Sequence, residues 1–387
     1  MIVRERGRAR RKPAGIVASS VLGLTLALLA LMPSQGAAVA GSREEMTTGQ
    51  ADMWPATFAS APSADAVTYD LCATTGSVTM PDSVLVPIWG FALKPELVDC
   101  SDLSVEAQLP GPPLAVTEGD TLTVNLHNNL DVNVSLVFPQ LELQPDTVGV
   151  APGGSKAYVF SADDLRPGSF IYESGVVAQE SGAGNTSCSD GVDNDGDLDV
   201  DGGDTDCANG NDARVQVPMG LYGPLIVRPS AGAGFAYNDA ATEFDVEATV
   251  VLGEIDPALN ADPNGFEMQY YAPTYWLISG EAYPDTDEIE AAAGERILFR
   301  YINASISHHV MALAGFHETV IAGDGYPLNF SYEAVSQTVA SGQTIDAIGT
   351  VPAGATSPSK FALYSANMHV TNVDSFPGGM LTFVSVP

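Results

Sequence analysis

Short stretches of alternating apolar and polar residues recur along this chain from Val67 onward. Clear examples are residues 85–93, 121–126, 157–160 and 225–227, each bounded by Gly, Pro, Asn or Asp. Such alternation is typical of half-buried β-strands, and its regular interruption by turn residues favours an all-β sandwich or barrel. No long stretch shows the periodicity of an amphipathic helix.

Three short patterns occur twice, in the same order, and indicate an internal duplication. The most specific one has a Gly and an acidic residue opening an alternating strand, with an Asn nine positions after the Gly. The paired segments are residues 116–128 and 291–303, residues 152–155 and 340–344, and residues 223–227 and 379–383. Three echoes in one order favour two tandem sandwiches over chance. We place the first domain at 67–230, with an insertion at 180–213, and the second at 231–387.

The N-terminal 40 residues have the order of an export signal. A basic start is followed by an apolar run from Gly15 to Met32 and then by the small residues Ala38, Val39 and Ala40. This order predicts a signal peptide at 1–40, removed on export by the Sec or the twin-arginine route, although the run is also near the length of an uncleaved anchor. Residues 41–66 are polar and aperiodic, which predicts a linker. We expect a periplasmic, cell-surface or extracellular protein with no membrane span after cleavage.

The chain is strongly acidic. It has 48 Asp and Glu against 15 Lys and Arg, for a formal net charge of −33. A surface of this sign repels nucleic acid and anionic lipid and attracts divalent cations. We therefore exclude nucleic acid and expect divalent cations as partners, with other envelope or extracellular proteins as further candidates. Adaptation to a saline habitat would produce the same composition.

The four cysteines predict disulfide bonds. They are Cys72, Cys100, Cys188 and Cys207. An even number in an exported chain is most simply explained by two bridges, for which three pairings exist. We favour pairing of sequence neighbours, Cys72 with Cys100 and Cys188 with Cys207.

The insertion is rich in aspartate. Its acidic residues follow the spacing of the oxygen ligands in an EF-hand-type loop: Asp193, Asp195, Asp197, Asp199, Asp201 and Asp204. Carboxylates this close repel one another, so the pattern favours a calcium-binding loop. A solvated acidic loop held by a disulfide is the alternative. No helical pattern flanks the loop, so it is not a complete EF-hand.

Several segments resemble one known family. Residues 109–120 (Leu-Pro-Gly-Pro-Pro-Leu-Ala-Val-Thr-Glu-Gly-Asp) resemble the opening of a multicopper-oxidase cupredoxin domain, and residues 216–229 resemble its close. Residues 302–305 and 320–325 are similar to the core of a second such domain. The resemblance extends over 67–387 apart from the insertion. It implies tandem cupredoxin-like Greek-key sandwiches with copper ligands at one end.

The histidines that the resemblance implies as copper ligands are missing. The corresponding positions hold Val137, Pro139, Glu173, Gly175, Ala312 and Ala314. No His-Cys-His motif is present, and its counterpart lies near residues 363–369. A full oxidase set needs roughly ten imidazoles and one thiolate in fixed geometry, whereas this chain has five histidines.

A smaller copper site remains as a candidate in the second half. It would use His317, His369 and Met368, with Met311 as an alternative sulfur ligand. His308 and His309 are neighbours on a predicted strand, so they point to opposite faces and do not easily bind one metal together. Surface or hydrogen-bonded histidines are the simpler explanation.

These observations predict an exported, non-catalytic, multicopper-oxidase-like protein. It would act as a binding, surface or assembly module, with Ca²⁺ as its cofactor and without copper. The alternative is a copper-dependent oxidoreductase whose copper site is reduced, displaced or supplied by a partner chain. The sequence leaves the ligand and the oligomeric state open.

Overall fold

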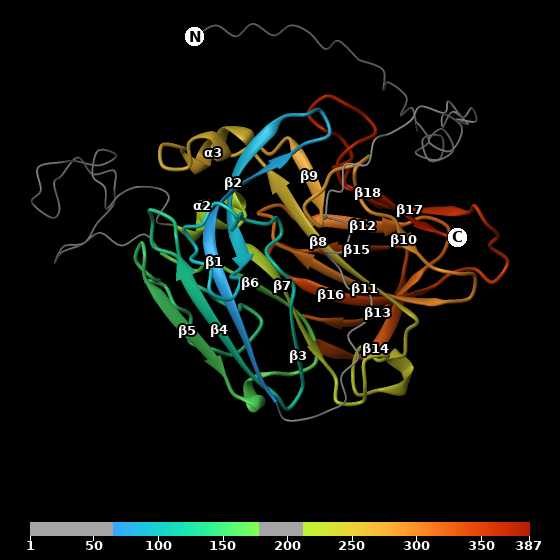
Figure 1. The fold of residues 1–387 in the computed structure, drawn as a ribbon. Helices are drawn as coiled ribbons and strands as arrows, with labels where there is room; N and C mark the ends of the chain where they lie inside the picture. Colours follow the sequence, from blue (N-terminus) through green and yellow to red (C-terminus); the bar gives the residue numbers. More distant parts are fainter. Residues whose placement is uncertain (1–64, 178–211) are drawn as a thin grey trace, which may run out of the picture. The chain divides into compact units, whose positions relative to one another are not determined.

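The computed structural model describes residues 65–177 and 212–387 (Figure 1). The strands of the first half are β1 (Ala66–Thr79), β2 (Leu85–Leu93), β3 (Leu114–Thr117), β4 (Thr121–Asn128), β5 (Ser155–Phe160), β6 (Gly168–Glu173) and β7 (Tyr222–Arg228). Its helical turns are the 3₁₀ turn η1 (Ala162–Asp164) and the short helix α2 (Ala213–Met219).

The second half contains the remaining strands. They are β8 (Val246–Ile255), β9 (Tyr275–Ile278), β10 (Ile289–Glu290), β11 (Arg296–Asn303), β12 (His309–Leu313), β13 (Glu318–Gly323), β14 (Tyr326–Ala334), β15 (Ser336–Val339), β16 (Thr344–Thr350), β17 (Lys360–Ser365) and β18 (Leu381–Ser385). The helical turns here are η5 (Ala240–Thr242), α3 (Pro257–Ala261) and η6 (Met268–Tyr270). The domain boundary predicted near residue 230 falls between β7 and β8.

Each half is a pair of sheets. The first half has sheets in the order β2-β1-β4-β5 and β3-β7-β6, and the second has β9-β8-β11-β16-β13-β14 and β10-β18-β17-β12-β15. The parallel pairing of β1 with β4 recurs as β8 with β11, and that of β3 with β7 recurs as β10 with β18. This repetition confirms the predicted all-β fold of two tandem sandwiches.

Alternation along the strands fills a separate core in each half. On β4, Leu122, Val124 and Leu126 are fully buried and belong to the first core, while on β11 Phe299 and Tyr301 belong to the second. Burial of each such side chain contributes about 1.5–3 kcal/mol. The hydrophobic pattern therefore accounts for both cores.

Asn128 and Asn303, the repeated asparagines, have equivalent roles in the two halves. The Asn128 Nδ2 donates to the carbonyls of Val132 and Val150, at 2.7 and 2.8 Å. The Asn303 Nδ2 donates in the same way to two carbonyls, at 2.9 and 3.0 Å. Each Oδ1 also accepts from the backbone N–H two residues later, at 2.9 Å in both halves. Both side chains are buried, so each asparagine satisfies the backbone of a loop that would otherwise lose hydrogen bonds.

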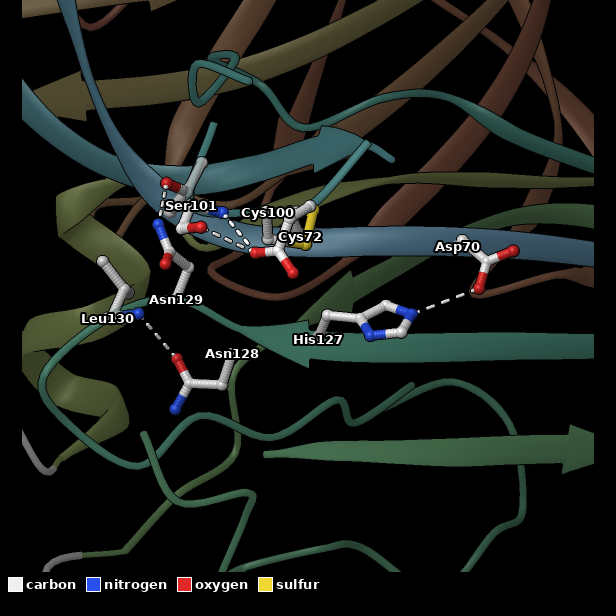
Figure 2. The surroundings of a disulfide bond; sticks show 10 residues. Asp70, Cys72, Cys100, Ser101, His127, Asn128, Asn129 and Leu130 are labelled. Carbon is white, nitrogen blue, oxygen red and sulfur yellow. Dashed lines mark hydrogen bonds and ion pairs between the residues drawn. A yellow bond between two sulfur atoms is a disulfide. The ribbon is translucent and has the colours of Figure 1, made fainter. Parts of the chain in front are cut away.

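A disulfide joins Cys72 on β1 to Cys100 in the loop that follows β2, which confirms one predicted bridge (Figure 2). Both cysteines are buried. The neighbouring strand β4 carries His127, whose Nε2 lies 3.2 Å from Oδ1 of Asp70. Pairing of Cys188 with Cys207 lies outside the described residues and stays a prediction.

Polar side chains join the two halves. Ser169 on β6 donates from its hydroxyl to Asp346 on β16 at 2.5 Å, and its carbonyl accepts from the Thr344 hydroxyl at 2.7 Å. The fully buried Arg300 on β11 bonds both Asp346 and Glu247. A buried charge needs partners of this kind because desolvation is costly.

The predicted signal peptide and nearly all of the linker and the insertion lie outside the described residues. Within 65–177 and 212–387, no helix has the length and apolar character needed to cross a bilayer.

Candidate functional site

Three of the positions implied as copper ligands come together in the first half. Val137 and Glu173 form a β-bridge, with N···O distances of 2.8 and 3.0 Å. A Cβ added at Gly175 would lie 2.2 Å from Cγ1 of Val137. The valine side chain therefore occupies the space that a side chain at 175 would need.

Glu173 is the one polar side chain of this group. Desolvation raises its pKa to about 7, because burial disfavours the charged carboxylate. Pro139 is exposed and lies outside the bridge. A carboxyl, an isopropyl group and a proline ring do not provide the imidazoles of an oxidase copper cluster.

The corresponding positions in the second half are filled by alanine methyl groups, which have no lone pairs. Ala312 is buried on β12, and Ala314 is exposed, with its N–H donating to the Ala362 carbonyl at 2.8 Å. In the described parts of the chain, no three His, Cys, Asp or Glu side chains gather as a metal-binding group. The residues present thus do not fit a multinuclear copper cluster.

Two histidines, however, meet in the second sandwich. His309 begins β12 and is fully buried, and His369 lies in the segment between β17 and β18. Their Nδ1 atoms are 3.0 Å apart. The Nε2 of His309 lies 3.0 Å from the Ser305 hydroxyl, and this second contact fixes the ring orientation.

Trp276 on β9 holds the pair from the other sheet. Its ring stacks on His369 at 3.6 Å with an interplanar angle of 3°, and it meets His309 edge-on at 5.9 Å. Desolvation, followed by the nearby His369 and His308, lowers the pKa of His309 to about 3. Desolvation and His308 lower the pKa of His369 too. Both rings are therefore neutral near pH 7.

The geometry allows two chemical states of the pair. Without a metal, one Nδ1–H donates to the other Nδ1, which is an ordinary histidine–histidine hydrogen bond. Nitrogen ligands bind a transition metal at about 2.0–2.1 Å, and two adjacent ligands of one ion then lie about 3 Å apart. The observed separation fits a mononuclear site with two imidazoles.

Two polar side chains, Asn367 and Ser365, lie next to the pair on the His369 side. Asn367 Nδ2 lies 3.3 Å from Nδ1 of His369, and the Asn367 Oδ1 accepts from the Ser365 hydroxyl at 2.6 Å. Ser365 lies in the segment where the family resemblance implies a copper-binding cysteine. A serine hydroxyl does not replace a thiolate as a soft ligand, so the site has nitrogen donors and no cysteine.

The structure separates the residues of the predicted copper set. His317 follows the end of β12 and is exposed, whereas the His309–His369 pair lies at the start of that strand. Met368 is 53% exposed and precedes His369, and Met311 is buried in the second core. His369 thus meets His309 rather than His317.

His309 and Trp276, with the hydrogen-bonding partners Ser305 and Asn367, are members of this site that the sequence did not identify. The alternating pattern was a usable signal for His309, because residues 309, 311 and 313 share one face of a strand and the latter two are apolar. Trp276 carries no comparable signal, since its contact joins β9 to His369 in the distant segment between β17 and β18.

The predicted calcium ligands lie outside the described residues. They are Asp193, Asp195, Asp197, Asp199, Asp201 and Asp204.

Comparisons with known proteins show similarity to multicopper oxidases and laccases. The family model described as multicopper oxidase matches residues 98–188. Among curated proteins of Oryza sativa subsp. japonica, putative laccase-11 is 24% identical over 275 residues, covering 67% of this chain and 44% of that protein. Putative laccase-17 is 28% identical over 261 residues, covering 64% and 40%. This chain spans less than half the length of these curated relatives.

Solved structures support the fold. A blue copper oxidase from Nitrosomonas europaea aligns with a TM-score of 0.63 at 18% identity, covering 83% of this chain and 86% of that one. A copper nitrite reductase from the same organism aligns with a TM-score of 0.59 at 19% identity, covering 83% and 94%. At these identities the likeness establishes the cupredoxin-like architecture.

The prediction of Ca²⁺ rather than copper as the cofactor is wrong. The matched proteins are laccases, a blue copper oxidase and a copper nitrite reductase, and none of them points to calcium. The smaller copper site predicted in the second half combined His369 with His317, whereas the structure places His369 against His309, which lies 60 residues away in the sequence.

Proposed function

We propose that this multicopper oxidase-like chain is an exported binding module that holds a single copper ion at His309 and His369. The observation that carries the proposal is the 3.0 Å separation of the two Nδ1 atoms. In this site the two imidazoles bind the metal, and Trp276 and Ser305 orient the rings. When bound, copper would supply one-electron redox chemistry; without a redox partner, the protein would simply retain the ion.

The described residues do not provide the ligands for oxidase activity. A full oxidase set needs imidazole and thiolate ligands in fixed geometry, and six of the implied positions hold residues without imidazole nitrogens. Val137 also fills the space beside Gly175. We therefore propose retention or delivery of the metal rather than turnover of phenols. Export from the cell rests on the predicted signal at residues 1–40, and partners in the envelope stay predictions.

A copper-dependent oxidoreductase is the second candidate. It is favoured by the match of residues 98–188 to the multicopper oxidase model. Such an enzyme would need cluster ligands from a partner chain, because the described residues of this one do not supply them.

Copper loading of the full chain tests the binding proposal. We expect the apoprotein to take up about one copper ion at this site, measured by elemental analysis after gel filtration. His369→Ala should abolish uptake, because it removes one of two nitrogen ligands. His317→Ala is the matched control, since His317 is exposed and lies beyond the opposite end of β12. Equal copper content in the two variants would refute the site.

Activity separates the two candidates. The copper-loaded chain should show no intense blue absorption, because the site has no cysteine thiolate, and no oxidation of a phenol such as 2,6-dimethoxyphenol. Phenol turnover dependent on His369 would favour the oxidoreductase instead.

A further inference from the structure

A second, chemically different cavity lies away from the histidine pair. Its volume is about 510 Å³, and its walls come from the segment 237–242, from strands β13, β14 and β16, and from Arg166 and Pro167 of the first half. Arg296, at the start of β11, closes one side. The cavity is therefore built from both halves of the described chain.

Two arginines, Arg166 and Arg296, line this cavity although the protein as a whole is acidic. Within residues 65–177 and 212–387, Arg166 and Arg296 form no ion pair with a carboxylate, whereas Arg214, Arg228 and Arg300 each do. An arginine without a carboxylate partner has no nearby anion to compensate its positive charge, so that charge is available to an anionic ligand.

Backbone carbonyls hold both guanidinium groups in place. Arg166 Nη2 donates to the carbonyls of Gln140 and Asp324, at 2.5 and 2.9 Å. The Arg166 guanidinium also stacks 3.9 Å from the ring centroid of Tyr326. Arg296 Nη2 donates to the carbonyl of Ala241 at 2.7 Å. These contacts position the cations before any ligand arrives, which lowers the entropy cost of binding.

The negative charge at the cavity is smaller than the positive charge. Asp239 is the one carboxylate among its lining residues, and its Oδ1 already accepts from the Ala241 N–H at 2.9 Å. Glu142 accepts from the Tyr326 hydroxyl at 3.1 Å and does not line the cavity. Two arginines and a single carboxylate, which is already hydrogen-bonded, favour the binding of a ligand that carries an anionic group.

The rest of the wall combines apolar surface with unused polar groups. Ile321, Ile348 and Leu328 supply the apolar part. The side chains of Asn329 and Thr350 also line the cavity, and they make no hydrogen bond within the described residues. A ligand with an anionic end and a flat apolar body would use both kinds of surface.

We propose that this cavity binds a small organic acid, a carboxylate on an apolar or aromatic body. The carboxylate is bound by Arg166 and Arg296, and the body lies along Ile321 and Ile348. This site is independent of the copper proposal, because its residues and those of the histidine pair do not overlap.

Calorimetric titration of the full chain with benzoate tests the proposal. We expect saturable binding of one benzoate per chain, and weaker binding of benzamide, which has the same shape without the charge. Arg296→Gln should weaken benzoate binding roughly tenfold, because it removes one charge-assisted contact. Arg214→Gln is the matched control, since Arg214 lies on α2 outside the cavity lining and pairs with Asp212, and it should leave the affinity unchanged.

A second variant keeps the test decisive if Arg296→Gln does not fold. Asn329→Asp adds a carboxylate on the exposed strand β14, and it should also weaken benzoate binding. Absence of saturable benzoate binding, or equal affinity in Arg296→Gln and the parent chain, would overturn the site. Inorganic phosphate binding as tightly as benzoate would overturn the requirement for an apolar body.

Discussion

Val137 and Gly175 are fitted to each other: a Cβ at residue 175 would lie 2.2 Å from Cγ1 of Val137. Real non-bonded carbon atoms do not approach so closely, so a larger residue at 175 requires the Val137 side chain or the backbone to move. The family resemblance implies a histidine at each. Two of the residues at the implied ligand positions in the first half are thus packed directly against each other.

Gly175→Ala should destabilise the fold by about 1–3 kcal/mol, the usual cost of overpacking. Urea denaturation measures the change. Gly354→Ala is the matched control, because no heavy atom lies within 4 Å of the added Cβ there. Combining Gly175→Ala with Val137→Ala should recover part of the loss, because the smaller residue makes room. Equal effects at 175 and 354 would contradict the close fit.

Glu318 should make stability fall as the pH rises. Desolvation raises its pKa to about 7, while the Tyr301 hydroxyl donates to its Oε1 at 2.5 Å. The unfolded carboxyl titrates near 4.5, so between these two pH values the folded state keeps a proton that the unfolded state has lost. The Glu318 contribution is complete below the unfolded pKa and is lost as the pH passes the folded one, by at most about 1.4 kcal/mol per pH unit.

Glu318→Gln tests this dependence by urea denaturation at pH 5 and pH 7. We expect the variant to lose less stability between the two values than the parent chain does. Glu333→Gln, at an exposed position on β14, should retain the parental difference. An unchanged difference in Glu318→Gln would mean that the carboxyl titrates alike in both states.

Much of the fold follows from the sequence because its determinants are local. The Gly-acid turns and the alternating strands act over a few residues, and the Asn that follows each Gly at a fixed spacing marks the same place in both halves, so all of them predict the duplicated sandwich. The side-chain bonds of the two asparagines recur almost atom for atom. The Cys72–Cys100 pairing was the simplest of three choices, and the structure confirms it.

The candidate site could be predicted only in part, because it depends on contacts between distant segments. The contact of His309 with His369 forms when the segment after β17 returns to the start of β12, and Trp276 reaches the pair from the other sheet. Strand alternation places His309 on the inward face but does not identify its partner. Arg166 and Arg296 likewise line one cavity only because the two halves pack together.

Removal of the Cys72–Cys100 bridge should lower the free energy of unfolding by about 2–4 kcal/mol. The bond closes a loop with a sequence separation of 28 residues, so its loss enlarges the unfolded ensemble. The double variant Cys72→Ala, Cys100→Ala avoids a free thiol, and urea denaturation measures the change. Denaturation of the parent chain with and without a reductant provides the comparison. A double variant as stable as the oxidised parent would show that the bridge is dispensable.

Replacement of Arg300 is expected to have the largest electrostatic effect on the free energy of unfolding. It is fully buried, and its guanidinium bonds Glu247 at 2.6 Å and Asp346 at 3.3 Å. Desolvation alone would raise the pKa of Glu247, but Arg300 and Arg228 outweigh it and lower that pKa. Arg300→Met would leave one arginine to balance two carboxylates, so we expect a loss of about 3–5 kcal/mol.

Two further measurements distinguish this network from ordinary packing. Arg214→Met, at an arginine whose side chain is 73% exposed, should cost less than about 1 kcal/mol. Combining Arg300→Met with Asp346→Asn should cost less than the sum of the two single variants, because the second change removes the carboxylate that the first leaves without its cation. The loss in Arg300→Met should also persist at 1 M salt, since a buried pair is poorly screened. Strict additivity, or a loss no larger than that of Arg214→Met, would show that Arg300 acts through its bulk and not through its charge.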